Sequence, residues 1–321
     1  MAKIRVLIVG GTGHTGSSVV DGLLETGNFA VVALIRPASI EKPAVRALQE
    51  QGVEIREGDL EESEEDLVKA LAEIDIVISC VSASQQQCQI PLANAAKKAG
   101  VKRFVPCGFI TVAPPAGVML LRDQKEVVYN HIKRLWLPYT FIDVGWWYQL
   151  AFPRLPSGRI DYAVLNATNE VIGGGNVLSA ITDLRNIGRY VAKIIADERT
   201  LNRMVFAYDT LMTQNQIYDL LEELSKEKID RNYVPDEALY ARGAVVRQSI
   251  QENPNDRRQL NLLYLVEYQL SWGVRGDNNP EYAKYLGYLL SKELYPDFEP
   301  TSFRDYLESV INGTAKHPYA S

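Results

Sequence analysis

The chain has 321 residues, which is enough for one large domain or two smaller domains around a substantial hydrophobic core. Its 34 Lys and Arg residues and 40 Asp and Glu residues give a net charge of −6, so a nucleic-acid or anionic-membrane surface is not expected. Its apolar runs are too short to span a bilayer, and neither its 3 cysteines nor its 3 histidines show metal-ligand spacing.

The beginning of the chain predicts a core strand that ends in a glycine turn, with no signal-peptide cleavage pattern. Together with the composition, this favours a cytoplasmic globular protein that holds no metal. We expect its partner to be a small molecule, with no nucleic-acid or membrane partner, and we expect a monomer or a homodimer.

The first 150 residues alternate between apolar strands and amphipathic helices. Strands are expected at residues 3–9, 29–36, 53–60, 75–82, 102–108 and 137–145, and helices at 17–27, 63–71, 89–100 and 122–135. Ser63 and Asp66 fit a capping box at the start of the second helix. Alternating strands and helices imply right-handed crossovers, and apolar strands without polar alternation fit burial on both faces. The pattern predicts an α/β fold with a doubly wound parallel sheet of the Rossmann type.

The second half of the chain is expected to be richer in helices. Helices are predicted at residues 182–195, 213–227, 236–251 and 257–270, with short strands at 160–165 and 170–176. Asp183 is expected to cap the first of these helices, and Thr213 with Gln216 to form a capping box on the second. We therefore expect a dinucleotide-binding domain at residues 1–150 and a smaller, α-rich, mainly substrate-binding domain at 151–321. Residues around 177–210 are expected to pack back onto the first domain.

A glycine loop, "GGTGHTG", follows the first strand. Gly10, Gly13 and Gly16 give the spacing G-x-x-G-x-x-G between a strand and a helix, where a tight turn lets the backbone approach a pyrophosphate. Its position in the first βαβ unit favours dinucleotide binding over a glycine-rich turn without a ligand, although that second interpretation stays open. The predicted phosphate-binding residues are Gly10, Thr12, Gly13, His14, Thr15 and Gly16.

The end of the second predicted strand favours NADPH over NADH. NAD sites usually place an acidic residue there for the ribose 2′-OH, whereas this strand ends in Arg36, with Lys42 a few residues on. A guanidinium suits a 2′-phosphate, although Arg36 and Lys42 could also be solvated surface charges. Asp59 and Leu60, after the third strand, are expected beside the adenine ring, unless Asp59 only caps the following turn.

Several segments together resemble a known family. "VLIVGGTGHTG", "EGDLEESEEDLVKAL", "DIVISCVS", "AAKKAGVKRFVPCGF", "LPYTFIDVG" and "ELYPDFEPTSFRDYL" are similar to the NmrA-like branch of the atypical short-chain dehydrogenases, nearest to its isoflavone reductase-like group. The resemblance implies an NADP-binding Rossmann domain, a smaller C-terminal substrate domain and a single catalytic lysine about a dozen residues before "LPYT". Lys125 stands at that position. Ser82, Phe109, Lys125 and Val144 complete the expected cofactor-binding set.

The helix expected at 122–135 also contains Tyr129 and Lys133, spaced as the Y-x-x-x-K pair of many short-chain dehydrogenases. Helix periodicity places Lys125 roughly 50° from the centre of the apolar face and Lys133 about 130° away. We therefore expect Lys125 to face the sheet and the Tyr129–Lys133 pair to be coincidental on a partly exposed helix. Asp123 is expected to cap this helix, which would put Lys125 in its first turn.

The residues near the predicted reaction site depart from the family pattern. The group often has Ser-Glu-Phe-Gly after the fifth strand, whereas this chain has "CGFI", with Cys107 and Gly108 at the first two positions. The sixth strand is followed by "GWWYQLAF", an aromatic segment that we expect to form the substrate wall. The predicted substrate-binding residues are Phe109, Trp146, Trp147 and Tyr148.

These observations predict an NADPH-dependent reductase. It would reduce a carbonyl, an imine or an activated double bond of an aromatic or polyketide-like small molecule, with Lys125 acting on the substrate oxygen. The alternative is a non-catalytic NADP(H) sensor of the NmrA type that binds a regulatory protein. Those sensors tend to lack the lysine, so Lys125 favours the enzyme.

Overall fold

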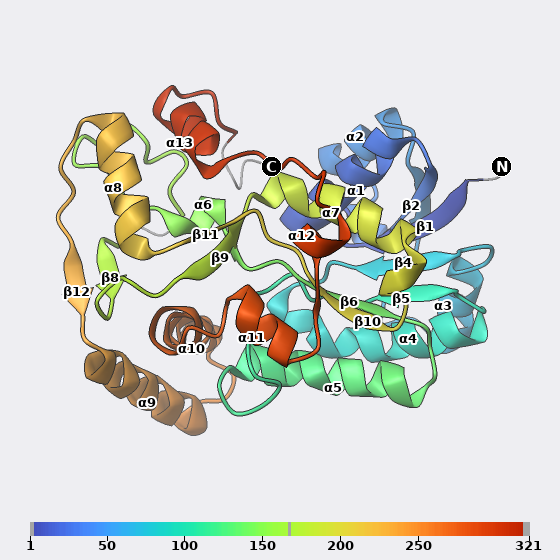
Figure 1. Ribbon diagram of the computed structural model, residues 1–321. Helices are drawn as coiled ribbons and strands as arrows, with labels where there is room; N and C mark the ends of the chain where they lie inside the picture. Colours follow the sequence, from blue (N-terminus) through green and yellow to red (C-terminus); the bar gives the residue numbers. More distant parts are fainter. Residues whose placement is uncertain (1–2, 166–167, 317–321) are drawn as a thin grey trace.

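A parallel β-sheet organises one half of the molecule, on the right of Figure 1. The structure is a computed structural model and describes residues 3–165 and 168–316. Five strands pair in the order β3-β2-β1-β4-β5, and every pair is parallel. They are β1 (Ile4–Val9), β2 (Phe29–Ile35), β3 (Glu54–Glu57), β4 (Ile76–Ser79) and β5 (Arg103–Val105). Because β1 lies between β2 and β4, the chain winds outward in both directions, which confirms the expected doubly wound fold.

Three further strands continue this sheet beyond β5. β6 (Thr140–Asp143) pairs in parallel with β10 (Arg203–Phe206), which pairs in parallel with β13 (Leu289–Leu290). The backbone N–H of Phe104 donates to the Pro138 carbonyl over 2.8 Å and joins β5 to the segment that enters β6. The chain therefore returns to the extended sheet twice after residue 150.

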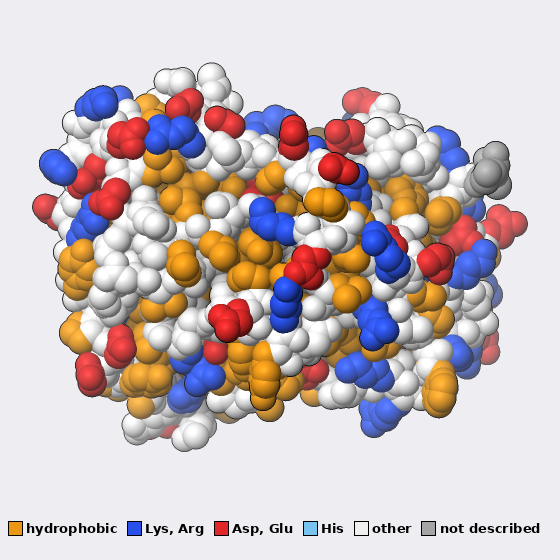
Figure 2. All heavy atoms as spheres, viewed as in Figure 1, with side chains coloured by type: hydrophobic (Ala, Val, Ile, Leu, Met, Phe, Trp, Pro, Cys, Tyr) orange, Lys and Arg blue, Asp and Glu red, His pale blue; other side chains and the backbone are white. Residues whose placement is uncertain are grey.

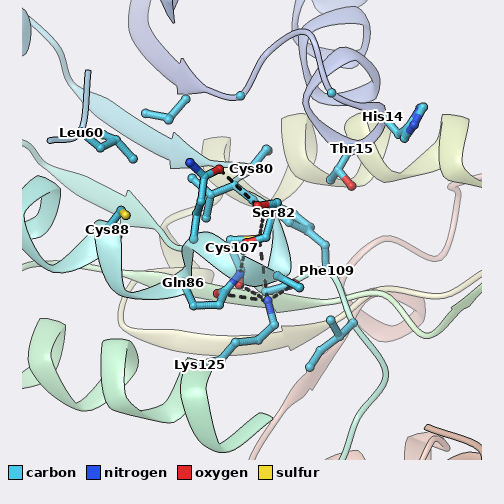
Figure 3. A pocket seen from close by; sticks show the side chains of 18 of the residues that line it. His14, Thr15, Leu60, Cys80, Ser82, Gln86, Cys88, Cys107, Phe109 and Lys125 are labelled. Carbon is cyan, nitrogen blue, oxygen red and sulfur yellow. Dashed lines mark hydrogen bonds between the residues drawn. The ribbon is translucent and has the colours of Figure 1, made fainter. Parts of the chain in front are cut away.

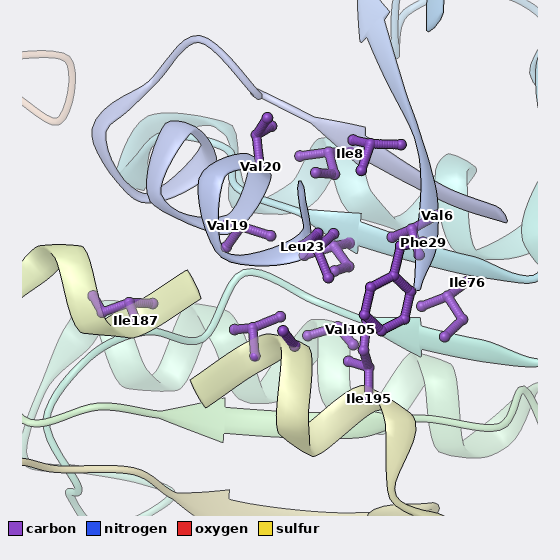
Figure 4. Close-up of a cluster of buried hydrophobic side chains, with 14 of the residues drawn as sticks. Val6, Ile8, Val19, Val20, Leu23, Phe29, Ile76, Val105, Ile187 and Ile195 are labelled. Atoms are coloured by element: carbon purple, nitrogen blue, oxygen red, sulfur yellow. The ribbon is translucent and has the colours of Figure 1, made fainter. Parts of the chain in front are cut away.

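Helices cover both faces of the sheet. Side chains of β1 alternate between the faces, as the two-residue period of a strand requires. Val6 and Ile8 pack in a cluster with side chains of α1 and α7, shown in Figure 4, and Leu7 and Val9 pack in a cluster with those of α3, α4 and α5. The helices are α1 (His14–Thr26), α2 (Pro43–Glu50), α3 (Glu64–Ala70), α4 (Gln89–Lys98), α5 (Leu120–Arg134) and α7 (Leu184–Ala196). This two-sided burial explains why the central strands β1, β2 and β4 are mostly apolar, whereas the edge strand β3 is polar and less buried.

Helices α1 and α7 touch through their backbones. A Cβ atom at Gly188 would lie 1.7 Å from the Ser18 carbonyl oxygen, and one at Gly22 would lie 2.1 Å from the Gly188 carbonyl carbon. At this crossing the Ser18 hydroxyl donates to the Leu184 carbonyl over 2.6 Å and accepts from the Gly188 N–H over 3.0 Å. The helix that begins at the glycine loop is thus held in place by a helix from the second half of the chain.

The other half of the molecule, on the left of Figure 1, is built from small sheets and helices. β7 (Trp146–Trp147), β9 (Ser179–Thr182) and β11 (Thr210–Met212) form one sheet, and β8 (Glu170–Ile172) and β12 (Asn232–Val234) form another. The helices are α6 (Tyr148–Ala151), α8 (Gln214–Ser225), α9 (Asp236–Glu252), α10 (Arg257–Gln269) and α13 (Phe303–Ile311). Two short helices, α11 (Pro280–Tyr285) and α12 (Ser291–Leu294), lie between the two halves at the centre of Figure 1. Short 3₁₀ turns are η1 (Pro37–Ser39), η2 (Ala83–Cys88) and η3 (Glu198–Thr200), and η4 (Leu270–Arg275) is a π-helical turn that directly continues α10.

Local capping signals in the sequence located several helix starts correctly. The Ser63 hydroxyl accepts from the Asp66 N–H at the start of α3, and the Asp183 carboxylate accepts from the Arg185 N–H at the start of α7. Thr213 and Gln216 form the full reciprocal capping box of α8. In each case the cap and its partner lie within three residues, so the local sequence is sufficient.

Some of the predicted elements differ from the observed ones, and some observed elements were not predicted. α1 begins at His14 rather than after the glycine loop, because Gly13 already acts as its N-cap residue. The segment 160–165 forms turns rather than a strand, and α2, which buries only Val45 and Leu48, was not predicted.

The start of α5 also differs from the prediction. The helix begins at Leu120, three residues before the expected Asp123 cap, so Lys125 lies in its second turn. The backbone N–H of Leu120 donates to the Glu267 carboxylate of α10 over 2.7 Å. An acidic side chain from another helix thus caps α5, which also suits the positive end of the helix dipole.

The visible surface carries no large region of one charge. In Figure 2, Lys and Arg side chains are interspersed with Asp and Glu side chains over the whole face. Among the described residues, no helix is both long and apolar enough to cross a bilayer.

A buried carboxyl group joins the sheet extension to α7. Asp209, which follows β10, accepts hydrogen bonds from the Asp183 N–H over 2.7 Å and from the Asn186 side-chain amide over 2.8 Å. Burial raises the pKa of Asp209 to about 6, from an ordinary value of 3.8. The folded protein therefore keeps this proton at pH values where the unfolded chain has lost it.

We predict that Gly188→Ala destabilises the protein by about 3 kcal/mol or more, because the new methyl group forces two backbones apart. Gly243→Ala is the matched control, since a Cβ atom there, in the helix α9, meets its nearest neighbour at 3.4 Å. The control should be neutral or stabilise by about 0.5 kcal/mol, since alanine favours the helix. Urea unfolding measures both variants, and equal midpoints would contradict the close contact.

We predict that the wild type gains stability relative to Asp209→Asn as the pH falls from 8 to 4. In this window the folded state binds more protons at residue 209 than the unfolded state does, so unfolding becomes less favourable on acidification. The gain should approach roughly 2–3 kcal/mol, as a pKa difference of about 2 implies. Denaturant unfolding of both proteins across this pH range tests it, and a difference that is flat or grows with rising pH would disprove it.

Candidate active site

A cavity of about 580 Å³ lies at the carboxyl ends of the central strands. The loops after β1, β2, β3, β4 and β5 form one side of it, and α5, β7 and α10 contribute the other. Figure 3 shows this arrangement, with the start of α1 above and Lys125 rising from α5 below. Ligands of open parallel sheets bind at this edge, where the winding direction reverses.

The structure places most of the predicted site residues in the cavity wall, and it excludes others. The predicted residues in the wall are Gly10, Thr12, Gly13, His14, Thr15, Arg36, Asp59, Leu60, Ser82, Phe109, Lys125, Trp146 and Trp147. The predicted residues outside the wall are Gly16, Lys42, Val144 and Tyr148.

The glycine loop makes a turn that admits no side chains at two of its glycines. Gly10 has a positive φ of 78°, and a Cβ atom there would lie 2.5 Å from the Cys80 carbonyl oxygen. A Cβ atom at Gly16 would lie 2.0 Å from the Gly10 carbonyl oxygen, so Gly16 supports the turn from behind. The first turn of α1, with His14 and Thr15, faces the cavity (Figure 3). Burial lowers the pKa of His14.

One end of the cavity is lined by residues that follow β2 and β3. The exposed Arg36 lies directly after β2 and precedes η1. Asp59 lines the cavity, and its carboxylate also accepts from the Glu61 N–H over 3.2 Å, as expected of a residue that caps the following turn. Lys42 is instead the N-cap residue of α2. The turn η1 separates it from the end of β2, and it does not line the cavity.

Lys125 is buried at the opposite end, with 2% of its surface exposed. Its Nζ donates to the Cys107 carbonyl over 2.6 Å, to the Gly108 carbonyl over 3.2 Å and to the Gln86 side-chain carbonyl over 3.3 Å. The Cys107 sulfur lies 3.7 Å from the same nitrogen. Three oxygens thus surround the amine where β5 ends, as the dashed lines of Figure 3 show.

Two glutamines of the segment after β4 connect Lys125 to the end of β5. The Gln86 side-chain oxygen accepts from the Gln89 amide over 3.1 Å, and the Gln89 oxygen accepts from the Cys107 N–H over 2.7 Å. Both glutamines are buried, and no motif in the sequence marks them as site residues. The sequence offers one hint of their role, a run of three glutamines at 85–87 after an apolar strand. Because glutamine is usually exposed, the sequence alone does not predict that these side chains are buried.

The Y-x-x-x-K pair lies outside the cavity wall. Lys133 is exposed, as expected. Tyr129, by contrast, is only 1% exposed and belongs to the buried side of this partly exposed helix. Its ring stacks on Phe141 of β6, with centroids 4.0 Å apart. The sheet extension through β6 explains this burial, because it covers a side of α5 that periodicity alone placed near the solvent boundary.

A buried ion pair fixes the helix that carries Lys125. The Arg122 guanidinium donates to the Asp143 carboxylate of β6 over 2.6 Å and to the Tyr288 hydroxyl over 2.9 Å, and that hydroxyl donates to Asp143 over 2.5 Å. Arg122 and Asp143 are each 1% exposed, and Glu126 accepts a further bond from Arg122 over 2.9 Å. These contacts tie α5, β6 and the segment before β13 together.

Aromatic and aliphatic side chains line the cavity near Lys125. Phe109, which has a positive φ of 55°, directs its N–H to the Ile142 carbonyl over 2.7 Å. Tyr268 of α10 faces Trp146, with ring centroids 5.2 Å apart, and burial together with the nearby Asp143 charge raises the pKa of Tyr268. The apolar and aromatic residues in this part of the wall are Phe109, Ile110, Leu121, Trp146, Trp147, Leu150 and Tyr268.

Two residues predicted near this region lie elsewhere. Tyr148 is fully buried in the second half of the molecule, where its ring packs edge-on against Phe303 with centroids 4.8 Å apart. α6 begins at Tyr148 and turns its side chain away from the cavity. Val144 is also fully buried, and its side chain packs in the core beside the sheet. Its backbone N–H donates to the Ile110 carbonyl over 2.9 Å.

Comparisons with known proteins agree with this geometry. The model of the NmrA-like family matches residues 2–260. Asnovolin J 5′,6′-dehydrogenase nvfM of Aspergillus novofumigatus (strain IBT 16806) is 45% identical over 314 residues, which cover 97% of this chain and 96% of that protein.

Solved structures of plant reductases share the fold over nearly the whole chain. Leucoanthocyanidin reductase of Vitis vinifera, in its binary complex with NADPH, superposes with a TM-score of 0.80 at 24% identity and covers 96% of this chain and 99% of its own. AtPrR2 with NADP⁺ and (+)-pinoresinol superposes with a TM-score of 0.76 at 26% identity, covering 97% of this chain and 99% of its own. The match of the family model to most of the sequence, and the close similarity to the fungal dehydrogenase along almost the full length, place this chain in the NmrA-like family.

Proposed function

We propose that the protein is an NADP(H)-dependent oxidoreductase that acts on a small, largely apolar molecule with an activated double bond. The observation that carries this proposal is the buried amine of Lys125, which lies in one cavity with the glycine loop and Arg36. Burying an amine is costly, so a buried lysine beside a dinucleotide site supports a chemical role for that lysine. The similarity to a named dehydrogenase supports the same class of activity.

The residues of the cavity fit a dinucleotide phosphate. The turn at Gly10 and the first turn of α1 offer a backbone cradle and the positive end of a helix to a pyrophosphate. Arg36 is exposed at the end of β2, where it would hold a 2′-phosphate by bidentate hydrogen bonds. Asp59, Leu60 and Ser82 would line the adenosine side and the middle of the site, and Phe109 would lie near the nicotinamide. AtPrR2, a relative of known structure, was solved with NADP⁺.

The nicotinamide, when bound, supplies or accepts the hydride. Lys125 acts on the substrate oxygen. Its two longer hydrogen bonds, to Gly108 and to Gln86, can be exchanged for one to a substrate carbonyl, while the 2.6 Å bond to Cys107 holds the amine in place. As a hydride reaches the β-carbon of an enone, negative charge develops on the carbonyl oxygen, and the Lys125 N–H stabilises that charge or donates its proton.

Among the three bonds considered from the sequence, the activated C=C bond is favoured. The relative that is 45% identical is named as a dehydrogenase of the 5′,6′ positions of asnovolin J. An oxidoreductase of this class can work in either direction, because the same positioned amine stabilises the same developing charge. The wall beside Lys125, with Phe109, Leu121 and Trp147, suits an apolar skeleton of the aromatic or polyketide-like kind.

Replacing Lys125 should separate turnover from cofactor binding. We predict that Lys125→Met lowers kcat by at least about a hundredfold, the usual contribution of a positioned acid, while NADPH affinity changes little. The assay follows NADPH oxidation with cyclic enones, quinones and aryl enones, and the reverse reaction with NADP⁺. NADPH affinity is measured by fluorescence titration.

Tyr129→Phe and Lys133→Ala are the matched controls for the Lys125 variant, since neither residue lines the cavity. Both should retain the wild-type rate. Full activity in Lys125→Met would refute the role of this lysine. Tight NADPH binding by the wild type, with no turnover on any probe and a stable complex with another protein, would instead support the sensor alternative.

Arg36 should determine the preference for NADPH. We predict that Arg36→Ala weakens NADPH binding about tenfold or more and leaves NADH binding nearly unchanged, because a charge-assisted bidentate bond to phosphate is lost. Lys42→Ala, outside the cavity wall, is the control and should change neither affinity. Titration of both dinucleotides against the three proteins measures the effect. A similar loss for NADPH and NADH in Arg36→Ala would show that Arg36 does not contact the 2′-phosphate.

A further inference from the structure

A second, smaller cavity lies behind the wall of the large one. Trp146 and Leu150 line both cavities, so these two side chains separate them. The smaller cavity has a volume of about 30 Å³, and the end of α10 and the π-helical turn η4 contribute Gln269 and Trp272 to its wall. Its space is enough for one or two water-sized groups and too small for a ring.

Two polar atoms in this wall lack partners. The Gln269 Oε1 and the Trp272 Nε1 are both buried, and neither forms a hydrogen bond to any residue that the structure describes. The two residues are 5% and 8% exposed. Buried polar groups in folded proteins nearly always find a partner, so an acceptor and a donor left unpaired around one cavity indicate that a polar group, either a water or part of a ligand, binds there.

The placement of Gln269 and Trp272 allows both to bind the same group. Gln269 and Trp272 are three residues apart on a continuous helical segment, and both line the smaller cavity. The segment changes to π-helical geometry between them, a feature that is frequent at functional sites. One wall atom accepts a hydrogen bond and the other donates one, which matches a hydroxyl group that donates and accepts at once.

The charge of the smaller cavity favours a neutral group. Glu170 is the charged residue in its described wall, and its carboxylate receives two hydrogen bonds from Arg242 of α9, over 2.9 Å and 3.0 Å. The carboxylate is therefore neutralised by a partner outside the cavity. A carboxylate or an ammonium on a ligand would find no opposite charge there.

The aromatic part of the partition between the cavities is Trp146, whose ring lies against two other rings. The Trp146 ring lies 5.9 Å from the Trp272 ring and 5.2 Å from the Tyr268 ring, centroid to centroid, and both contacts are tilted rather than closely stacked. Trp146 is partly exposed to the large cavity. A substrate that enters beside Lys125 therefore meets Trp146 as the last barrier before the unpaired groups.

We propose that the smaller cavity is a subsite for the far end of the substrate, and that it binds a hydroxyl group there. The hydroxyl donates to the Gln269 oxygen and accepts from the Trp272 N–H once Trp146 has shifted aside. The substrate is thus a mostly apolar molecule with a reacting carbonyl system at one end and a neutral hydroxyl at the other. This inference rests on the proposed function for the position of the reacting end beside Lys125.

Paired ketones test the subsite by binding alone. The NADP⁺-loaded protein is titrated calorimetrically with a series of ω-(4-hydroxyphenyl)alkan-2-ones that have two, three or four methylene groups, each beside its phenyl analogue. At one chain length or more, the hydroxyl should strengthen binding about tenfold, which is what two modest hydrogen bonds provide. No gain at any length, or no binding by any member, would overturn the subsite.

Variants of Gln269 and Trp272 test whether the two unpaired groups cause the gain in affinity from the hydroxyl. Gln269→Met and Trp272→Phe should each remove most of the gain from the hydroxyl and leave the affinity of the phenyl analogues unchanged. Tyr306→Phe is the matched control, because the Tyr306 hydroxyl is also buried and unpartnered but lines neither cavity. It should leave the gain intact, and a gain that survives in Gln269→Met and Trp272→Phe would overturn the proposal.

Two further measurements make these results unambiguous. The unfolding midpoint of Gln269→Met should match that of the wild type, whereas that of Trp272→Phe should be lower, because the smaller ring leaves space in a buried cluster. NADP⁺ affinity and the turnover of Lys125→Met report on the proposed function separately. A normal cofactor site and a lysine-dependent reaction without any hydroxyl gain would refute the subsite alone.

Discussion

The whole architecture depends on the parallel pairing of the central strands. Parallel strands need a crossover between each pair, so all their carboxyl ends lie at one edge and the crossover helices cover both faces. β1, β2 and β4 therefore deliver the glycine loop, Arg36 and Ser82 to the same edge although the residues lie far apart in the chain. The extension through β6, β10 and β13 adds the end of β6 and the aromatic β7 to that edge. The cavity is a consequence of this topology rather than of any single segment.

Buried charges near the reacting end are compensated in two different ways. Arg122 and Asp143 neutralise each other and share the Tyr288 hydroxyl, which fixes α5 against the extended sheet. Lys125, one turn further along α5, is bonded instead by carbonyl oxygens of Cys107, Gly108 and Gln86. Carbonyl oxygens stabilise an amine without a full opposite charge, so the amine stays available to a second oxygen. A carboxylate in their place would bind the amine far more strongly and compete with a substrate.

The second half of the chain acts mainly by closing and supporting the site. α7 presses against α1 at Gly22 and Gly188, and so sets the position of the helix that follows the glycine loop. α10 does two things at once: Glu267 caps the start of α5, and its neighbour Tyr268 lines the cavity. The glutamate is itself paired with Arg247 of α9 over 2.8 Å. The wall that faces the substrate is thereby coupled to the helix that carries the catalytic candidate.

Features that depend on residues close together in the chain could be predicted from the sequence. The apolar strands, the glycine loop, Arg36 and the caps at Ser63, Asp183 and Thr213 are all local patterns, because strand period, turn conformation and capping act within a few residues. Periodicity also placed Lys125 on the buried side of its helix.

Features that depend on contacts between residues far apart in the sequence became visible in the tertiary structure alone. The start of α5 is set by Glu267, which lies 147 residues from Leu120, and no local pattern announces such a cap. Tyr129 is buried because β6 and its neighbours extend the sheet beneath it, and Tyr148 leaves the cavity because α6 turns it into another core. Gln86 reaches Lys125, and Gln269 and Trp272 meet at the second cavity, through packing between helices and strands. Such contacts depend on which helices and strands pack against each other, and local sequence patterns do not specify that packing.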